Sequence, residues 1–398
     1  MIKLGVSAAG VSAAVLGSVV YAAAPAAPSG PVATYWMDVA TQSGMGAGMS
    51  SGMNAAQMMA MMNGGGGAIH TLDLRLASKT KPSGSPQADH LIPSTLQMGA
   101  SLPLLTPVRE PAEPATPGMP TQWTQPKGRM LIYWGCGEHV SAGQPTVIDF
   151  SKMQPGKVPP GMAAMASMAK VVSGPHSAPG FGKWPNERDS RQVPVSGSLI
   201  GAHQVQANYA PPIAFSLAAG QDFMPALGLR EAPMPSGASR LTWNAAPTAT
   251  GYALSMFGSN AGGDVIMWSS ASKAQMAALD YLSPAEVKRL IAAGAVLPPS
   301  TTQCVLPAEV ASASPHGMVM GIGYGPEANF SDNPKAPKWA TKVRYKTTAS
   351  LMRGMSQMMQ GMGPDGDDEA AAQPQQQQQQ PKKRRGIGIG DLLGAIPH

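Results

Sequence analysis

Short segments of β-forming residues follow one another through the second half of the chain, and the first three are spaced at roughly ten residues. The segments are residues 240–243, 251–257, 265–269, 302–306, 318–324 and 339–347. Turns rich in Pro, Gly and Asn separate them. Such regular interruption excludes long helices and a heptad array, and it is typical of an antiparallel β-sandwich.

The first half of the chain also contains strand patterns. Residues 71–76 alternate polar and apolar side chains, as a half-buried strand does. Residues 129–135 and 146–151 predict one antiparallel pair, and residues 199–209 and 213–217 predict a second. We therefore predict a mainly β protein with two β-sandwich-like modules, residues 68–237 and 238–351.

One short helix is expected inside the second module, at residues 283–293. Ser283 and Glu286 form a capping box, and Pro284 occupies the first helical position. An apolar stripe follows, and Gly294 is a natural end for the helix.

Residues 238–349 resemble a fibronectin type III or immunoglobulin-like module. The resemblance depends on Trp243 in one strand and Tyr252 in the next, with the spacing of the strands around them. It implies a sandwich with both aromatic side chains in its core. The chain departs from the family through the inserted helix and through the lack of a convincing tyrosine corner. Because this fold serves many functions, the resemblance implies little about activity.

The two ends of the chain have a different composition from the middle. Residues 1–26 combine one lysine, an apolar run and small residues, which is the pattern of a secretory signal peptide. Residues 27–67 are rich in Met and Gly and predict a flexible segment, while residues 352–398 predict a disordered, Gln-rich tail. No later stretch approaches the twenty apolar residues of a membrane span. We expect an exported protein, either periplasmic or at the cell surface.

The charge balance is mildly basic, with 28 Lys and Arg against 22 Asp and Glu. A small, dispersed excess of this kind does not indicate a nucleic-acid partner. The concentrated basic run is Lys382, Lys383, Arg384 and Arg385. It is expected to be a solvated part of the tail, and weak contact with an anionic surface is the alternative.

The two cysteines, Cys136 and Cys304, leave two interpretations open. They form one disulfide between the modules, or they are two separately buried thiols. Glu138 and His139 follow Cys136 closely, but neighbouring residues on a strand point to opposite faces. A Cys–His catalytic pair is therefore not favoured, and we expect a protein without enzymatic activity.

Methionine is unusually frequent, with 28 of 398 residues, and much of it lies in three short clusters. Thioether sulfurs are soft donors that suit Cu(I), and several converge when methionines recur every three or four residues along a helix. The candidate ligands are Met45, Met49, Met53, Met58 and Met62. The competing interpretation is an adaptable apolar surface that packs on the β-modules or on a partner. Cu(I) is thus only an alternative cofactor, and none is expected.

Two tryptophans, Trp123 and Trp184, lie in Pro-rich stretches and are candidates for an exposed platform that binds sugar rings. The leading expectation is a non-enzymatic envelope protein that docks on a protein or surface partner. Sheet edges and exposed apolar side chains would make the contact. A glycan-binding module and a periplasmic copper-handling protein are the alternatives.

Overall fold

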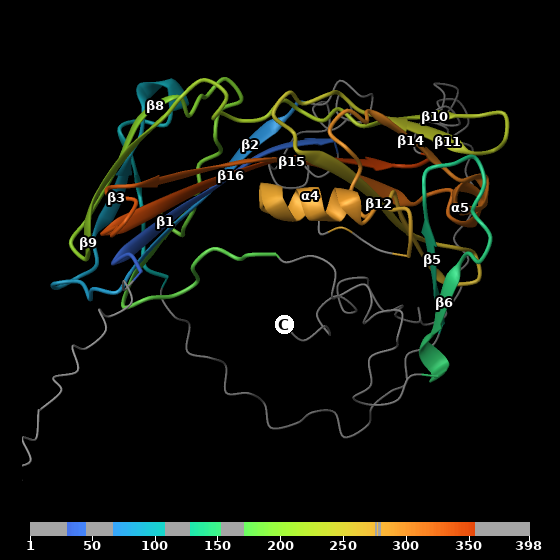
Figure 1. Ribbon diagram of the computed structural model, residues 1–398, viewed down its shortest axis with the longest axis horizontal. Coiled ribbons are helices and arrows are strands. Elements are labelled where there is room, and N and C mark those ends of the chain that lie inside the picture. The colour runs from blue at the N-terminus through green and yellow to red at the C-terminus, as the bar shows by residue number, and fades with distance from the viewer. Residues whose placement is uncertain are drawn as a thin grey trace, which may run out of the picture. The chain divides into compact units, whose positions relative to one another are not determined.

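The structure is a computed structural model that describes residues 30–44, 67–107, 128–152, 171–274, 277 and 280–354. In this part of the chain, sixteen strands form three sheets, so the mainly β class is confirmed (Figure 1). The expected signal peptide and most of the Met/Gly-rich segment lie outside the described residues, as does the expected tail except for residues 352–354, which end β16 and follow it.

The largest sheet has nine strands. In sheet order they are β6 (Thr146–Asp149), β5 (Arg129–Trp134), β13 (Val265–Ser269), β12 (Gly251–Ser259), β15 (Met318–Ser331), β16 (Trp339–Met352), β1 (Ala33–Gly44), β2 (Ile69–Ser78) and β7 (Gly180–Trp184). Two neighbouring pairs, β1–β16 and β5–β13, are parallel, and the other pairs are antiparallel.

Two smaller sheets accompany it. The four-stranded sheet has the order β4 (Ser101–Pro103), β3 (Ala88–Leu91), β8 (Gly201–Ala207) and β9 (Ala210–Leu217). The three-stranded sheet has the order β10 (Arg230–Pro233), β11 (Ser239–Thr242) and β14 (Gln303–Leu306). The short helical elements are α4 (Pro284–Ala292), α5 (Ala308–Ala313), η2 (Ser94–Leu96) and η3 (Phe150–Lys152).

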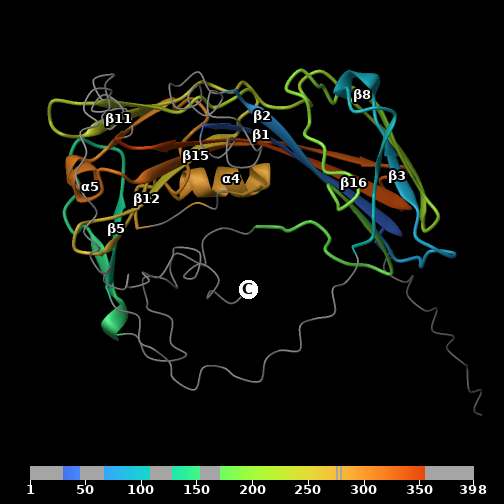
Figure 2. The ribbon, with the colours of Figure 1, turned by 180° about the vertical axis from the view of Figure 1, so that it is seen from behind.

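Both smaller sheets cover the same face of the long sheet. On β16, Val343 and Tyr345 belong to a core shared with the four-stranded sheet, and Ala349 belongs to a core shared with the three-stranded sheet. Alternate residues of a strand point to one face, so all three side chains point the same way. Figures 1 and 2 show the two smaller sheets at opposite ends of the long strands. Helix α4 packs on the other face, against Ala253, Ile322 and Tyr324.

The expected helix and strand pairs are confirmed. The Ser283 hydroxyl accepts a hydrogen bond from the Glu286 amide at the start of α4, and Gly294 has a φ of +73° at its end. The pairs β5–β6 and β8–β9 are antiparallel. Trp243 and Tyr252 are both buried, with ring centroids 5.6 Å apart. The strands of the two expected modules mix in the nine-stranded sheet, which therefore crosses the boundary expected between residues 237 and 238.

The start of the described chain requires a correction. Residues 33–44, expected inside the flexible segment, form β1 in the interior of the long sheet. Strand β1 is stabilised in this position by a residue 306 positions later in the sequence. Arg344 of β16 donates two hydrogen bonds to the Asp38 carboxylate, each 2.6 Å long. The Arg344 guanidinium also lies 4.6 Å from the centre of the Trp36 ring. The ion pair and the cation–π contact tie β1 to β16.

Candidate interaction surface

The four-stranded sheet and the part of the long sheet below it form a sandwich with one closed and one open side. On the closed side, Leu105 and Lys183 exchange backbone hydrogen bonds of 3.0 and 2.9 Å beside β4 and β7. On the opposite side lie β9 and the last residues of β15, where the described chain supplies no further strand. We call residues 213–217 of β9 and 327–331 of β15 the open side.

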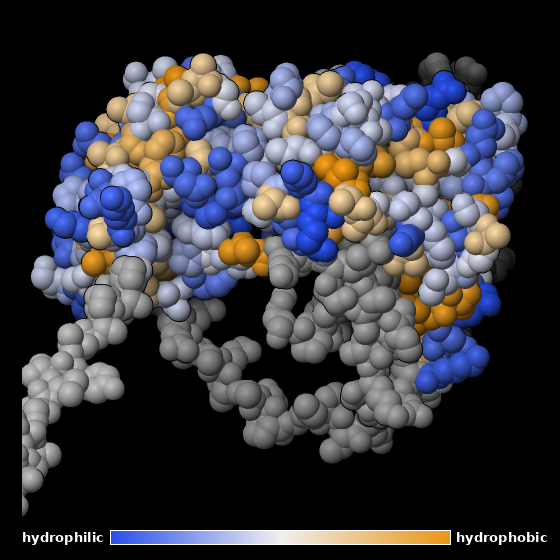
Figure 3. All heavy atoms as spheres, viewed as in Figure 1, coloured by the Kyte–Doolittle hydropathy of each residue, from blue (hydrophilic) through white to orange (hydrophobic). Residues whose placement is uncertain are grey.

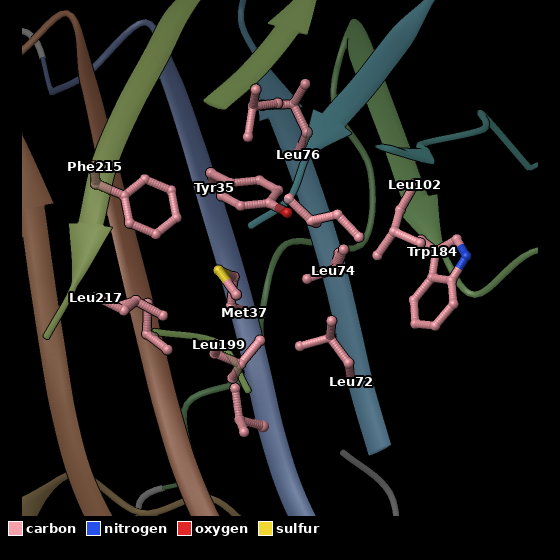
Figure 4. Close-up of a cluster of buried hydrophobic side chains, with 14 of the residues drawn as sticks. Tyr35, Met37, Leu72, Leu74, Leu76, Leu102, Trp184, Leu199, Phe215 and Leu217 are labelled. Atoms are coloured by element: carbon pink, nitrogen blue, oxygen red, sulfur yellow. The ribbon is translucent and has the colours of Figure 1, made fainter. Parts of the chain in front are cut away.

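Strand β9 follows from its sequence. Ile213, Phe215 and Leu217 are buried, and Ala214 and Ser216 between them are exposed, as expected for a strand with one face on a core. Figure 4 shows Phe215 and Leu217 directed into that core beside Tyr35 and Met37. The strand contains no charged residue.

The β15 part of the open side results from an irregularity in the sheet. Strand β12 pairs with β15 only as far as Tyr324, and the register with β16 shifts between Tyr324 and Glu327. Beyond this bulge, residues 327–331 pair with β16 alone among the described strands. The Glu327 carboxylate is held by Lys342 at 2.7 Å. Phe330 stacks on Phe215 of β9 at 5.2 Å, which joins the two halves of the open side.

The other sheet edges in the described chain are shorter or covered. Strands β6, β10 and β14 have four residues each and β4 has three, against eight in β9. The edge strand β10 also carries charged residues and a proline, which natural edges use to prevent pairing. The edge of strand β14 is partly covered, because the Gly137 amide donates a hydrogen bond of 3.0 Å to the Val305 carbonyl. Strand β9 begins with Ala210, Pro211 and Pro212, and the five residues after them, 213–217, form the longest uncharged edge segment among the described strands.

A series of buried, hydrogen-bonded side chains lies in the core next to Phe215 of the open side. The His203 Nε2–H donates to the Leu199 carbonyl at 2.7 Å, so His203 Nδ1 accepts from His90 Nε2–H at 2.9 Å. His90 Nδ1 in turn accepts from the Tyr35 hydroxyl at 2.8 Å. The ring of Phe215 lies nearly parallel to that of His203, with centroids 5.1 Å apart. Each hydrogen bond fixes the tautomer of the next imidazole, and the Phe215 ring packs against the His203 ring that these bonds orient.

Both imidazoles of this series are fully buried and electrically neutral at pH 7. Burial lowers the pKa of His90 well below its usual value, and the neighbouring His203 lowers it further. Burial also lowers the pKa of His203, although its bond to the Leu199 carbonyl acts in the opposite direction. Burial raises the pKa of Tyr35, so its hydroxyl keeps its proton. Tyr35, His90 and His203 are therefore joined by hydrogen bonds between neutral side chains inside an apolar core.

The cysteine question has a clear structural answer. Cys136 and Cys304 form a disulfide with a sequence separation of 168 residues, and it joins the segment after β5 to β14. A sulfur held in a disulfide is not a nucleophile. His139 does not approach it as a base but lies 3.0 Å from Glu309 at the surface. The stretch of residues 136–139 is thus a loop that the disulfide cross-links to β14.

The remaining predicted site residues are buried or lie outside the description. Trp184, expected in an exposed loop, ends β7 and is only 2% exposed, because it packs in the core under the four-stranded sheet (Figure 4). This corrects its interpretation as a sugar platform. Residues outside the described part are Trp123, Met45, Met49, Met53, Met58, Met62, Lys382, Lys383, Arg384 and Arg385.

Other kinds of site receive no support from the described residues. Among them, no group of three His, Cys, Asp or Glu side chains is arranged to hold a metal ion. No helix in the described part is long and apolar enough to cross a bilayer. On the face drawn in Figure 3, hydrophobic and hydrophilic residues are intermixed. The sheet edge is therefore the better guide to a contact surface.

Sequence reasoning identified the strand pattern of residues 213–217 but did not place it at an edge. Edge position depends on which strands pair across the whole chain, and no local signal carries this information. The absence of Asp, Glu, Lys and Arg between residues 192 and 221 was visible in the sequence, but it includes the interior strand β8 and so does not by itself mark the edge.

Comparison with known proteins gives no further guide. No protein-family model matches the chain, and no curated protein matches it significantly.

Proposed function

We propose that the protein is an exported, non-enzymatic protein of the cell envelope that binds a protein partner through its open side. The observation that carries this proposal is that the uncharged residues 213–217 of β9 have a pairing partner on only one side in the described chain. An edge of this kind accepts an extended segment from a partner, which adds to the sheet through backbone hydrogen bonds.

The compartment is part of the same proposal. A disulfide between distant residues fits an oxidising environment, and the pattern of residues 1–26 fits export. No observation in the described chain favours glycan binding or copper binding, because the residues proposed for them lie outside it or, for Trp184, are buried.

The test uses two lysine pairs that differ by one strand. Ala214→Lys/Ser216→Lys places charge on the edge strand β9, where lysine opposes strand addition. Ala202→Lys/Gln204→Lys is the matched control, because these exposed residues lie directly opposite Ser216 and Ala214 on the interior strand β8. We expect affinity capture from envelope extracts to fall by about tenfold, or ~1.4 kcal/mol, for the β9 variant only.

An equal loss of capture in both variants would indicate that the partner binds the outer face of the four-stranded sheet and not its edge. Unchanged capture by the β9 variant would reject binding through the open side. Thermal unfolding of both variants confirms that each still folds.

A further inference from the structure

The open side requires a particular pattern of side chains in any strand that pairs with it. A strand added beside β9 continues the four-stranded sheet, so its alternate residues lie above the same core as Ile213, Phe215 and Leu217. Those positions require apolar side chains. The positions between them continue the outer face, where Ala214 and Ser216 are small and exposed, so small residues fit there.

Strand β9 itself has this pattern, with apolar residues at 213, 215 and 217 and small residues at 214 and 216. We propose that the partner at the open side is a second copy of this chain, with β9 of one copy pairing antiparallel to β9 of the other. This proposal depends on the function proposed above and names its partner. A two-fold axis beside Phe215 brings each Phe215 next to its counterpart and places Ile213 opposite Leu217 and Ala214 opposite Ser216. Apolar residues then meet apolar residues, and small residues meet small ones.

The charge distribution allows this contact. Because β9 has no charged side chain, the two-fold arrangement brings no like charges together within the pair. In the second layer of the sandwich, Glu327 is already neutralised by Lys342, and the exposed residue between the ends of the segment is the uncharged Asn329. The open side is therefore electrostatically compatible with a copy of itself.

The extent of the contact predicts a reversible dimer. Pro211 and Pro212 lack the amide hydrogens that a ladder needs, so pairing is limited to residues 213–217. Five residues of strand extend about 17 Å. A contact of this length is at the small end of specific interfaces, so we expect monomer and dimer to exchange with concentration.

The experiment measures the self-association of the full chain by sedimentation equilibrium. Wild type is expected to form a concentration-dependent dimer. In Ala214→Lys/Ser216→Lys the introduced lysines face each other across the axis, and we expect the dissociation constant to rise at least tenfold. In Ala214→Lys/Ser216→Glu each introduced lysine faces an introduced glutamate of the other copy, and we expect the dimer to return. The control Ala202→Lys/Gln204→Lys should dimerise as wild type does.

Three results would overturn the proposal. They are a wild type that is monomeric at every concentration, a double-lysine β9 variant that dimerises normally, and a lysine–glutamate variant as weak as the double-lysine one. If wild type is monomeric while the double-lysine β9 variant still loses capture from envelope extracts, self-association is wrong and the proposed function stands. If that variant changes neither dimerisation nor capture, both proposals fail.

Discussion

Lowering the pH from 6 to 5 is expected to destabilise the folded protein through His90 and His203. Both imidazoles are buried with depressed pKa values, so each takes up its proton at a lower pH in the folded than in the unfolded state. In the unfolded chain an imidazole titrates near 6.5 and takes up a proton below that pH. The unfolded state therefore binds more protons as the pH falls through 6.5, and stability decreases.

The magnitude follows from proton linkage. Each imidazole that is neutral when folded and charged when unfolded costs up to about 1.4 kcal/mol per pH unit, so two cost up to about 2.7. The free energy of unfolding of a protein is commonly about 5–15 kcal/mol, so the loss is easily measured. His70, whose pKa burial also lowers, adds to the same trend. Asp189 does not contribute in this range, because Arg191 lowers its pKa to about 2 and its effect begins only below its unfolded value near 4.

Urea unfolding at a series of pH values between 7 and 5 measures this slope. The double variant His90→Gln/His203→Gln should flatten it, because it removes both imidazoles whose pKa values burial lowers. If the slope of wild type is zero, or equals that of the double variant, the neutral His–His chain is not a feature of the folded protein.

Three further variants test the interactions that stabilise the folded chain. Asp38→Asn leaves Arg344 buried without its carboxylate and should cost about 3–5 kcal/mol in urea unfolding, whereas a cost below about 1 would contradict the buried ion pair. Cys136→Ser/Cys304→Ser should lower the free energy of unfolding by about 4 kcal/mol, and an unchanged urea midpoint would refute the cross-link. Trp184→Ala should cost about 3–5 kcal/mol, and a loss of sugar binding without a loss of stability would instead indicate an exposed platform.

Local signals in the sequence predicted much of the fold. The capping box at Ser283 and the stop at Gly294 located α4, because a cap depends only on nearby residues. Alternation located β2, because one face of that strand packs on a core. These signals act over a few residues, and the folded chain follows them.

The missed elements depend on distant contacts. Strand β1 starts in a stretch dominated by Ala, Pro and Gly, and its place in the sheet is stabilised by the Asp38–Arg344 pair. Strand β7 begins with glycines, and Gly180 leaves space that the Tyr209 ring fills, so its sequence does not look like a strand. Trp184 was misplaced for the same reason. The open side was missed because an edge is defined by the strands that are not beside it.

Amide hydrogen exchange in the complex tests most sharply whether the partner binds at the open side. In the free protein, the outward amides of residues 213–217 and 327–331 lack a backbone partner among the described residues and should exchange quickly. When a partner is bound, we expect exchange to slow at both segments, while β13 in the interior of the long sheet keeps its rates. Protection that appears elsewhere, with both segments unchanged, would contradict binding through the open side.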